Sequence, residues 1–162
     1  MMPLAPQRSV KLANLIEERV ELARRGQNPF VICRMKPGWL VIGDVQPLPG
    51  YCVLLADPLV ESINALDEAG RSQYSLDTIR AGDAILATTD AYRINYETLS
   101  NSEPALHTHI IPRYRTEPDE KRGRVAWVVY DWRTARRFDP AQPTTNGHFP
   151  TRHSRRRCAT SM

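Results

Sequence analysis

The sequence has no long apolar run, few cysteines and no Cys-x-x-C pair. Nothing approaches the ~20 apolar residues of a membrane helix, and residues 1–8 lack the apolar segment of a secretory signal, so we expect a cytoplasmic protein with no membrane partner. The three cysteines, Cys33, Cys52 and Cys158, predict neither a disulfide framework nor a cysteine zinc site. What remains is 162 residues with 41% hydrophobic and 25% charged side chains, which is typical of one soluble globular domain.

The net charge of +4 is unevenly distributed along the chain. Residues 133–162 hold seven arginines and one acidic residue, so this segment carries +6 and the rest of the chain carries −2. The segment is also rich in proline and polar residues, and such a composition buries too little apolar surface to offset chain entropy. We therefore expect a basic, disordered tail at 133–162. Its arginine cluster at 152–157 could contact RNA, ribosomes or acidic lipid, or could act only as a solubilising tail.

The remaining chain predicts an α+β fold. Apolar spacing indicates an N-terminal helix at 9–25, capped by Ser9, and a long central helix at 67–88 whose apolar face is Leu76, Ile79 and Leu86. Strands are predicted at 30–34, 39–42, 51–55, 93–99, 105–112 and 124–130. We expect a mainly antiparallel sheet in a body at 29–132, with the helix of residues 1–28 packed on it.

Two of the four histidines lie two positions apart in an apolar run, where residues 104–113 read Pro-Ala-Leu-His-Thr-His-Ile-Ile-Pro-Arg. Strand side chains alternate with period two, so His107 and His109 are predicted on one face, opposite Leu106, Thr108 and Ile110. A neutral imidazole is a good nucleophile, and its ordinary pKa of about 6.5 leaves it uncharged at neutral pH. The pattern is consistent with a nucleophile beside a phosphate ligand, with two metal ligands, or with two ordinary packed histidines.

The surrounding residues resemble the signature of the histidine triad superfamily, in which an Asn and a Gln/Asn–Ser pair precede His-x-His-x-His-x-x-Pro-Arg. Residues 95–113 follow this pattern, except that Ala105 replaces the first triad histidine. The loop at 44–50 is similar to the family's Asp-hydrophobic-x-Pro loop, which an apolar strand follows. After that strand Leu59 lies where many members carry histidine. The similarity covers roughly residues 30–132, and it is greatest to bacterial diadenosine polyphosphate hydrolase-like members.

The resemblance implies catalytic roles for four residues. His107 would be the nucleophile that forms a nucleotidyl-histidine intermediate, and His109 would donate a hydrogen bond to a phosphate oxygen. Asn101 and Ser102 would reach the phosphate and the leaving group, although both also suit a solvated turn. Ala105 would keep the backbone carbonyl that orients the His107 ring.

The resemblance also implies a nucleotide-binding set. Asp44 would accept hydrogen bonds from the ribose hydroxyls, a task that suits a carboxylate because it only accepts. Val45 would pack on the sugar or base, and Asn95 would contact the α-phosphate or the sugar edge. Arg113 would pair with a distal phosphate or, more commonly for such a side chain, at the surface with an acid of the loop at 117–119.

We therefore expect hydrolysis of dinucleoside polyphosphates or nucleoside phosphoramidates at the α-phosphate. No cofactor is implied, although magnesium can accompany a polyphosphate substrate. One alternative is a non-catalytic nucleotide-binding or sensing module. Another is a metal-binding protein that uses His107 and His109, but zinc needs three or four ligands and no further ligand lies at motif spacing. Subunits of the family commonly pair, so a homodimer is expected, with the aromatic segment at 127–132 in the core or the dimer contact.

Overall fold

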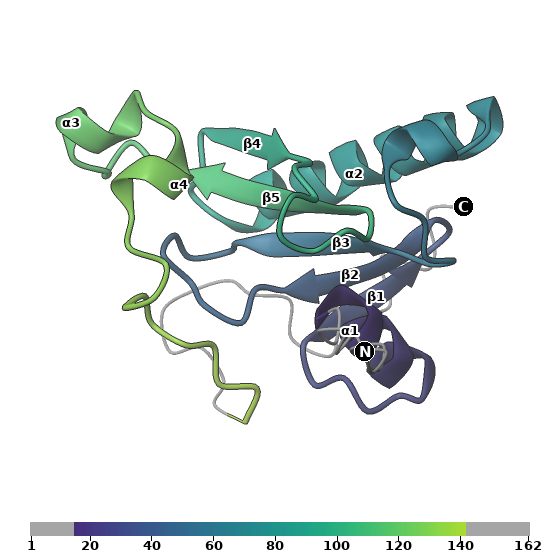
Figure 1. Cartoon of the computed structure of the whole chain (residues 1–162). Coiled ribbons are helices and arrows are strands. Elements are labelled where there is room, and N and C mark those ends of the chain that lie inside the picture. Colours follow the sequence, from purple (N-terminus) through teal and green to yellow (C-terminus); the bar gives the residue numbers. More distant parts are fainter. Residues whose placement is uncertain (1–14, 142–162) are drawn as a thin grey trace, which may run out of the picture.

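The computed structural model of the protein describes residues 15–141 and contains a five-stranded antiparallel sheet (Figure 1). The strands are β1 (Val31–Met35), β2 (Gly38–Ile42), β3 (Cys52–Ala56), β4 (Arg93–Glu97) and β5 (His107–Arg113). Their spatial order is β1-β2-β3-β5-β4, so β5 is internal and β4 is an edge strand. The helices are α1 (Leu15–Arg24), α2 (Glu68–Thr88), α3 (Asp119–Arg122) and α4 (Ala126–Val129), and a 3₁₀ turn, η1, spans Ile63–Ala65.

This architecture confirms the predicted α+β class. One of the six predicted strands is not a strand in the structure. Residues 126–129 form the short helix α4 rather than a sixth strand. The segment 125–129 is a continuous apolar run without alternation, and periodicity alone cannot assign such a run. Ser9, the predicted cap of the first helix, lies outside the described residues. Within the described part of the chain, no helix is long and apolar enough to cross a membrane.

The central helix α2 buries a different face from the one predicted. Leu76, Ile79 and Leu86 are 46%, 51% and 39% exposed, so their assignment to the core is wrong. The buried face is made largely of small and polar residues: Tyr74, Asp77, Thr78, Ala81, Gly82 and Ile85. Gly82 allows a close approach, because a Cβ atom there would lie 2.0 Å from the Tyr96 hydroxyl of β4. The helix packs through small side chains, which a search for large apolar residues does not detect.

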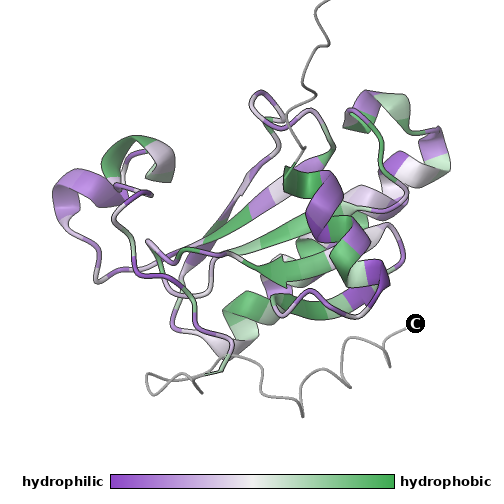
Figure 2. Cartoon of the chain, turned by 60° about the horizontal axis from the view of Figure 1, so that its bottom comes forward, coloured by the Kyte–Doolittle hydropathy of each residue, from purple (hydrophilic) through white to green (hydrophobic). Residues whose placement is uncertain are grey.

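The other face of the sheet packs against α1 and the segment that follows β5. Ile16 and Val20 of α1 join Val41, Val53 and Ile111 in one buried cluster. Trp127 and Trp132 are partly buried against the same cluster, beside the histidine face of β5. Figure 2 shows that the strands between these two layers are mainly apolar. The histidine face is therefore covered by aromatic and aliphatic side chains.

The predicted boundary at residue 133 does not coincide with a break in the structure. The carbonyl of Arg136 accepts a hydrogen bond from the Gln46 amide at 2.8 Å, and the Phe138 amide donates to the Asp44 carbonyl at 2.9 Å. Val45 and Arg137 form an isolated β-bridge between these two bonds. The chain after α4 thus returns to the loop that carries Asp44 (Figure 1). Residues 142–162, with the arginine cluster, lie outside the described residues.

Candidate active site

The two histidines lie on one face of the internal strand β5, as the period-two pattern predicts. Thr108, between them, points to the opposite face, where its hydroxyl lies 3.0 Å from that of Tyr74. His107 is buried, and His109 is partly exposed. The two rings are nearly perpendicular, at 84°, with centroids 4.9 Å apart. The structure thus brings the two predicted catalytic imidazoles together.

The backbone fixes the proton position of His107. Its Nδ1 lies 2.7 Å from the carbonyl oxygen of Ala105. A carbonyl oxygen only accepts, so Nδ1 must carry the proton and Nε2 of the neutral ring keeps its lone pair. The backbone supplies this carbonyl whatever the side chain at position 105. Ala105 belongs to the buried apolar cluster of Val53, Leu55 and Ile111, and the partly buried Leu59 packs against this cluster.

His109 has a side-chain partner instead. Its Nδ1 lies 2.6 Å from the hydroxyl of Tyr51, and the two rings are nearly parallel, at 20°. Burial, together with the nearby His107, lowers the pKa of His109 to about 4. Burial also raises the pKa of Tyr51. At neutral pH the contact therefore joins an uncharged imidazole and a protonated phenol.

Three aromatic side chains enclose His109, and sequence reasoning did not assign any of them to the site. The Trp127 ring meets the His109 ring edge-on, with centroids 5.0 Å apart. Trp132 stacks on Trp127 at 3.7 Å and meets Tyr51 edge-on at 5.0 Å. The aromatic spacing at 127–132 was visible in the sequence, but its position over the histidines depends on the path of the chain after β5.

An acidic residue lies opposite His109 on the edge strand. Glu97 of β4 pairs with His109 of β5 in the sheet register. Burial raises the pKa of Glu97, while Arg113 and the Trp127 indole act to lower it. The Trp127 N–H is near this carboxyl but does not meet hydrogen-bond geometry with any group among the described residues. The histidine pair thus has a carboxyl group beside it on β4.

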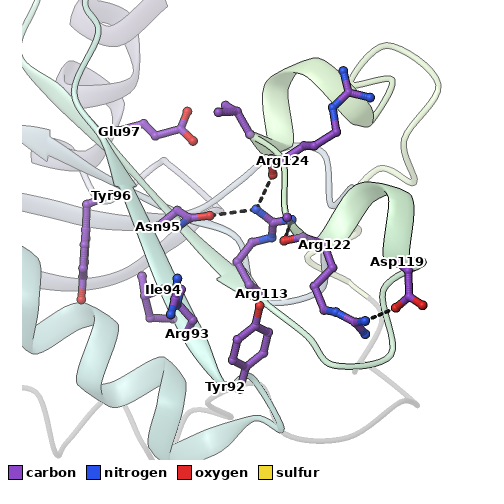
Figure 3. A pocket seen from close by; sticks show the side chains of 12 residues that line it. Tyr92, Arg93, Ile94, Asn95, Tyr96, Glu97, Arg113, Asp119, Arg122 and Arg124 are labelled. Carbon is purple, nitrogen blue, oxygen red and sulfur yellow. Dashed lines mark hydrogen bonds and ion pairs between the residues drawn. The ribbon is translucent and has the colours of Figure 1, made fainter.

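Arg113 is a buried structural residue. Its guanidinium binds Glu117 through Nε at 3.0 Å and Nη2 at 2.9 Å. Its Nη1 donates to Asn95 Oδ1 at 2.9 Å (Figure 3). Further bonds reach the backbone carbonyls of Lys121, Arg122 and Arg124. Arg113 pairs with an acid of the predicted loop, Glu117. The prediction that this pair lies at the surface is wrong, because both residues are buried. Burial acts to raise the pKa of Glu117, but the hydrogen bonds from Arg113, the Tyr114 backbone N–H and the Tyr130 hydroxyl, together with the Arg113 charge, lower it overall.

The bond to Arg113 also defines the position of Asn95. This residue lies on the histidine face of β4 but is opposite Ile111, two pairs beyond the Glu97–His109 pair. Its amide oxygen is already used by Arg113. Among the described residues, the side-chain N–H groups of Asn95 have no side-chain partner. They are therefore the part of this side chain that can bind a ligand.

Asp44 lies in the loop between β2 and β3, and its carboxylate pairs with Arg19 of α1. The side chain is 41% exposed, so one face of the carboxylate is open to solvent. The preceding Gly43 donates through its backbone N–H to the Tyr51 carbonyl at 2.9 Å, so the loop begins beside the residue whose hydroxyl contacts His109. Val45 is half-buried and pairs with Arg137.

Asn101 and Ser102 are not brought to the histidines by a direct contact. Both are exposed in the turn before β5, where Ser100 has a positive φ of 50°. Among the described residues no hydrogen bond joins either side chain to His107 or His109. Their assignment to phosphate and leaving group stays a prediction. Within the same residues, no group of three or more His, Cys, Asp or Glu side chains is arranged to hold a metal ion.

Neither a family model nor a curated protein matches the sequence. Among solved structures, a histidine triad protein from Bradyrhizobium japonicum aligns with a TM-score of 0.57 and 24% identity, over 67% of this chain and 78% of that one. A histidine triad protein from Sinorhizobium meliloti 1021 aligns with a TM-score of 0.54 and 18% identity, over 80% and 84%. A hypothetical histidine triad nucleotide-binding protein from Sulfolobus tokodaii strain 7 gives 0.54 and 15%, over 64% and 73%. The chain therefore has the histidine triad fold.

Proposed function

We propose that the protein hydrolyses nucleotides at the α-phosphate, with His107 as the nucleophile. The observation that carries the proposal is the Ala105 carbonyl on His107 Nδ1, because it leaves the Nε2 lone pair available. A histidine that only fills space in the core needs neither a fixed tautomer nor a second, neutral histidine beside it. The histidine triad fold of the solved structures supports the same class of chemistry.

The reaction proceeds in two balanced steps. His107 Nε2 attacks the α-phosphorus, so an N–P bond forms as the P–O or P–N bond to the leaving group breaks; a phosphate leaves as the anion, whereas an amine takes a proton from solvent as it leaves. Water then attacks the same phosphorus, the N–P bond breaks with its electron pair returning to the imidazole, and the proton of the attacking water passes to solvent. His109 donates a hydrogen bond to a non-bridging oxygen, where negative charge increases in the transition state. Asn101 and Ser102 are assigned to the phosphate and the leaving group.

The substrates we propose are dinucleoside polyphosphates or nucleoside phosphoramidates. Asp44 would accept from the ribose hydroxyls, and its exposed position is compatible with that role once Arg19 shares the carboxylate. Val45 would pack on the sugar, and the free N–H groups of Asn95 would face the phosphate. Magnesium would enter only with a polyphosphate substrate.

The proposal is tested by comparing the wild type with His107→Gln, measuring both turnover and binding of one substrate. Wild-type protein should convert diadenosine tetraphosphate or adenosine 5′-phosphoramidate into a mononucleotide product, followed by chromatography. His107→Gln keeps most of the side-chain volume, so it should abolish turnover while nucleotide affinity stays within about tenfold, about 1.4 kcal/mol. Turnover by His107→Gln at the wild-type rate would refute the nucleophile assignment. Binding without turnover in the wild type would instead favour a nucleotide-sensing module, which Ala105 and the exposed Asn101 already make the second candidate.

We also propose that the chain pairs with a second copy through the β4 edge. Leu76, Ile79 and Leu86 are exposed on α2, and Tyr96 of β4 is 41% exposed. A groove of about 690 Å³ runs along β4 and includes the exposed Val125 (Figure 3). An open strand edge presents unpaired backbone groups that a partner strand can cover.

The sequence of β4 is self-complementary for such pairing. If two copies run antiparallel about Asn95, Arg93 of one copy faces Glu97 of the other, twice. Sedimentation velocity should show a dimer that Arg93→Glu weakens, and Arg93→Glu combined with Glu97→Arg should restore it. Arg25→Glu, in the turn that follows α1 and with a 67% exposed side chain, is the matched charge control. A monomeric wild type, or a double variant no better than the single one, would contradict this register.

A further inference from the structure

Tyr51 is the residue at this site whose role the proposed mechanism leaves open. Its ring is 5% exposed, and its hydroxyl contacts His109 Nδ1 at 2.6 Å. Gly43 is required for this position, because a Cβ atom there would lie 2.2 Å from the Tyr51 ring. The Gly43 amide also donates to the Tyr51 carbonyl at 2.9 Å. Backbone and ring are thus both held, so the hydroxyl has a defined direction.

The direction of the hydrogen bond follows from the available partners. Either group could donate, since both the phenol and a neutral imidazole have one proton to give. Within residues 15–141, the Tyr51 hydroxyl has no other hydrogen-bond partner than His109. If His109 donated, the phenol proton would be buried without an acceptor, at a cost that structures normally avoid. Tyr51 is therefore the donor and His109 Nδ1 the acceptor.

The ionisation states of the neighbouring groups agree with this direction. The groups that act on Tyr51 are Cys52, Asp44 and Glu97; none of them favours a phenolate, and burial opposes it as well. Burial and His107 keep His109 neutral down to a pKa of about 4. A neutral imidazole that accepts at Nδ1 must carry its single proton on Nε2.

We propose that Tyr51 is a positioning residue that fixes His109 in the Nε2–H tautomer, the opposite of the tautomer that Ala105 imposes on His107. Two histidines on the same face of β5 then differ in function. His107 presents a lone pair, and His109 presents an N–H donor. The inference rests on the proposed function for its catalytic meaning, since a phosphate oxygen needs a donor and the phosphorus needs a nucleophile.

Ring-nitrogen spectroscopy tests the tautomer without any substrate. In ¹⁵N-labelled full-length protein at pH 7, two-bond proton–nitrogen spectra should show His109 protonated at Nε2 and His107 protonated at Nδ1. Signals are assigned with His107→Gln and His109→Gln. A wild-type His109 that carries its proton on Nδ1 would overturn the proposal outright, whatever the variants do.

Tyr51→Phe removes only the hydroxyl. His109 should then become a mixture of tautomers, and the midpoint of its titration should rise by roughly one pH unit, because the lost bond favoured the neutral ring. If the protein turns over nucleotides, kcat should fall roughly tenfold with KM little changed, since part of the population keeps the donor. Tyr74→Phe is the matched control, as its buried hydroxyl lies 3.0 Å from that of Thr108 on the other face of the sheet and should leave His109 unchanged.

The nitrogen spectra test the role of Tyr51, and the turnover assay tests the proposed hydrolysis, so the two proposals can fail separately. An unchanged His109 nitrogen pattern in a folded Tyr51→Phe protein would refute the role of Tyr51, even if nucleotides are hydrolysed. The expected pattern in a protein that never turns over nucleotides would instead refute the proposed hydrolysis and leave the tautomer assignment standing.

Discussion

The low pKa of His109 makes a quantitative prediction about stability in acid. In the unfolded chain this histidine has a pKa near 6.5, whereas in the folded protein burial and His107 lower it to about 4. Between these values the unfolded state binds more protons, so stability is complete above about pH 6.5 and is lost as the pH falls towards 4. The linkage relation gives a loss of about 2 kcal/mol at pH 5 and about 3 kcal/mol at pH 4. Urea unfolding followed by fluorescence between pH 7 and pH 4 measures this loss.

Other groups also lose stabilising interactions in acid, so a comparison is needed. The pKa values of Asp57 and Glu117 are lowered by their arginine partners, and their contribution falls at still lower pH in any variant. His109→Gln cannot be protonated, so its free energy of unfolding should fall less than that of the wild type by about 2 kcal/mol between pH 7 and pH 5. Parallel pH profiles for the two proteins would show that His109 titrates normally and would refute the burial argument.

Two further predictions concern packing and the buried ion pair. Glu117→Gln leaves the buried Arg113 charge without a carboxylate partner, so it should cost about 3–5 kcal/mol in urea unfolding, and a cost below about 1 kcal/mol would contradict the pair's burial. Leu106→Ala, at a fully buried site between β5 and α2, should cost about 2–5 kcal/mol, whereas Leu99→Ala, at a position 54% exposed, should change stability by about 0.5 kcal/mol or less. Equal effects at Leu106 and Leu99 would contradict the assigned core.

The sequence predicted best those features that depend on local periodicity. His107 and His109 share a face because alternation is a property of any extended strand, and the strand ends of the sheet were within one or two residues. The inner face of α2 was predicted wrongly, because Ala81 and Gly82 bury the helix by close approach while the larger Ile79 faces outward. Propensity arguments favour large apolar residues and so select the wrong side of such a helix.

The aromatic surroundings of the site could not be derived from the sequence for a different reason. Trp127 reaches His109 only because the chain turns back after β5, through a four-residue helix that was read as a strand. Tyr51 lies 58 positions before His109 and meets it only across paired strands. Contacts of this range depend on the tertiary path of the chain, and no local pattern encodes them.

The strand β5 sets a limit on how this site can change by insertion or deletion. Its residues His107 and His109 lie on the same face as Arg113, which holds the segment carrying Trp127 through the carbonyls at 121, 122 and 124. One added residue within β5 would send part of this set to the α2 face, because strand side chains alternate. An insertion in the exposed turn at 98–104 changes no such alternation. Length variation among homologues should therefore be absent from residues 107–113.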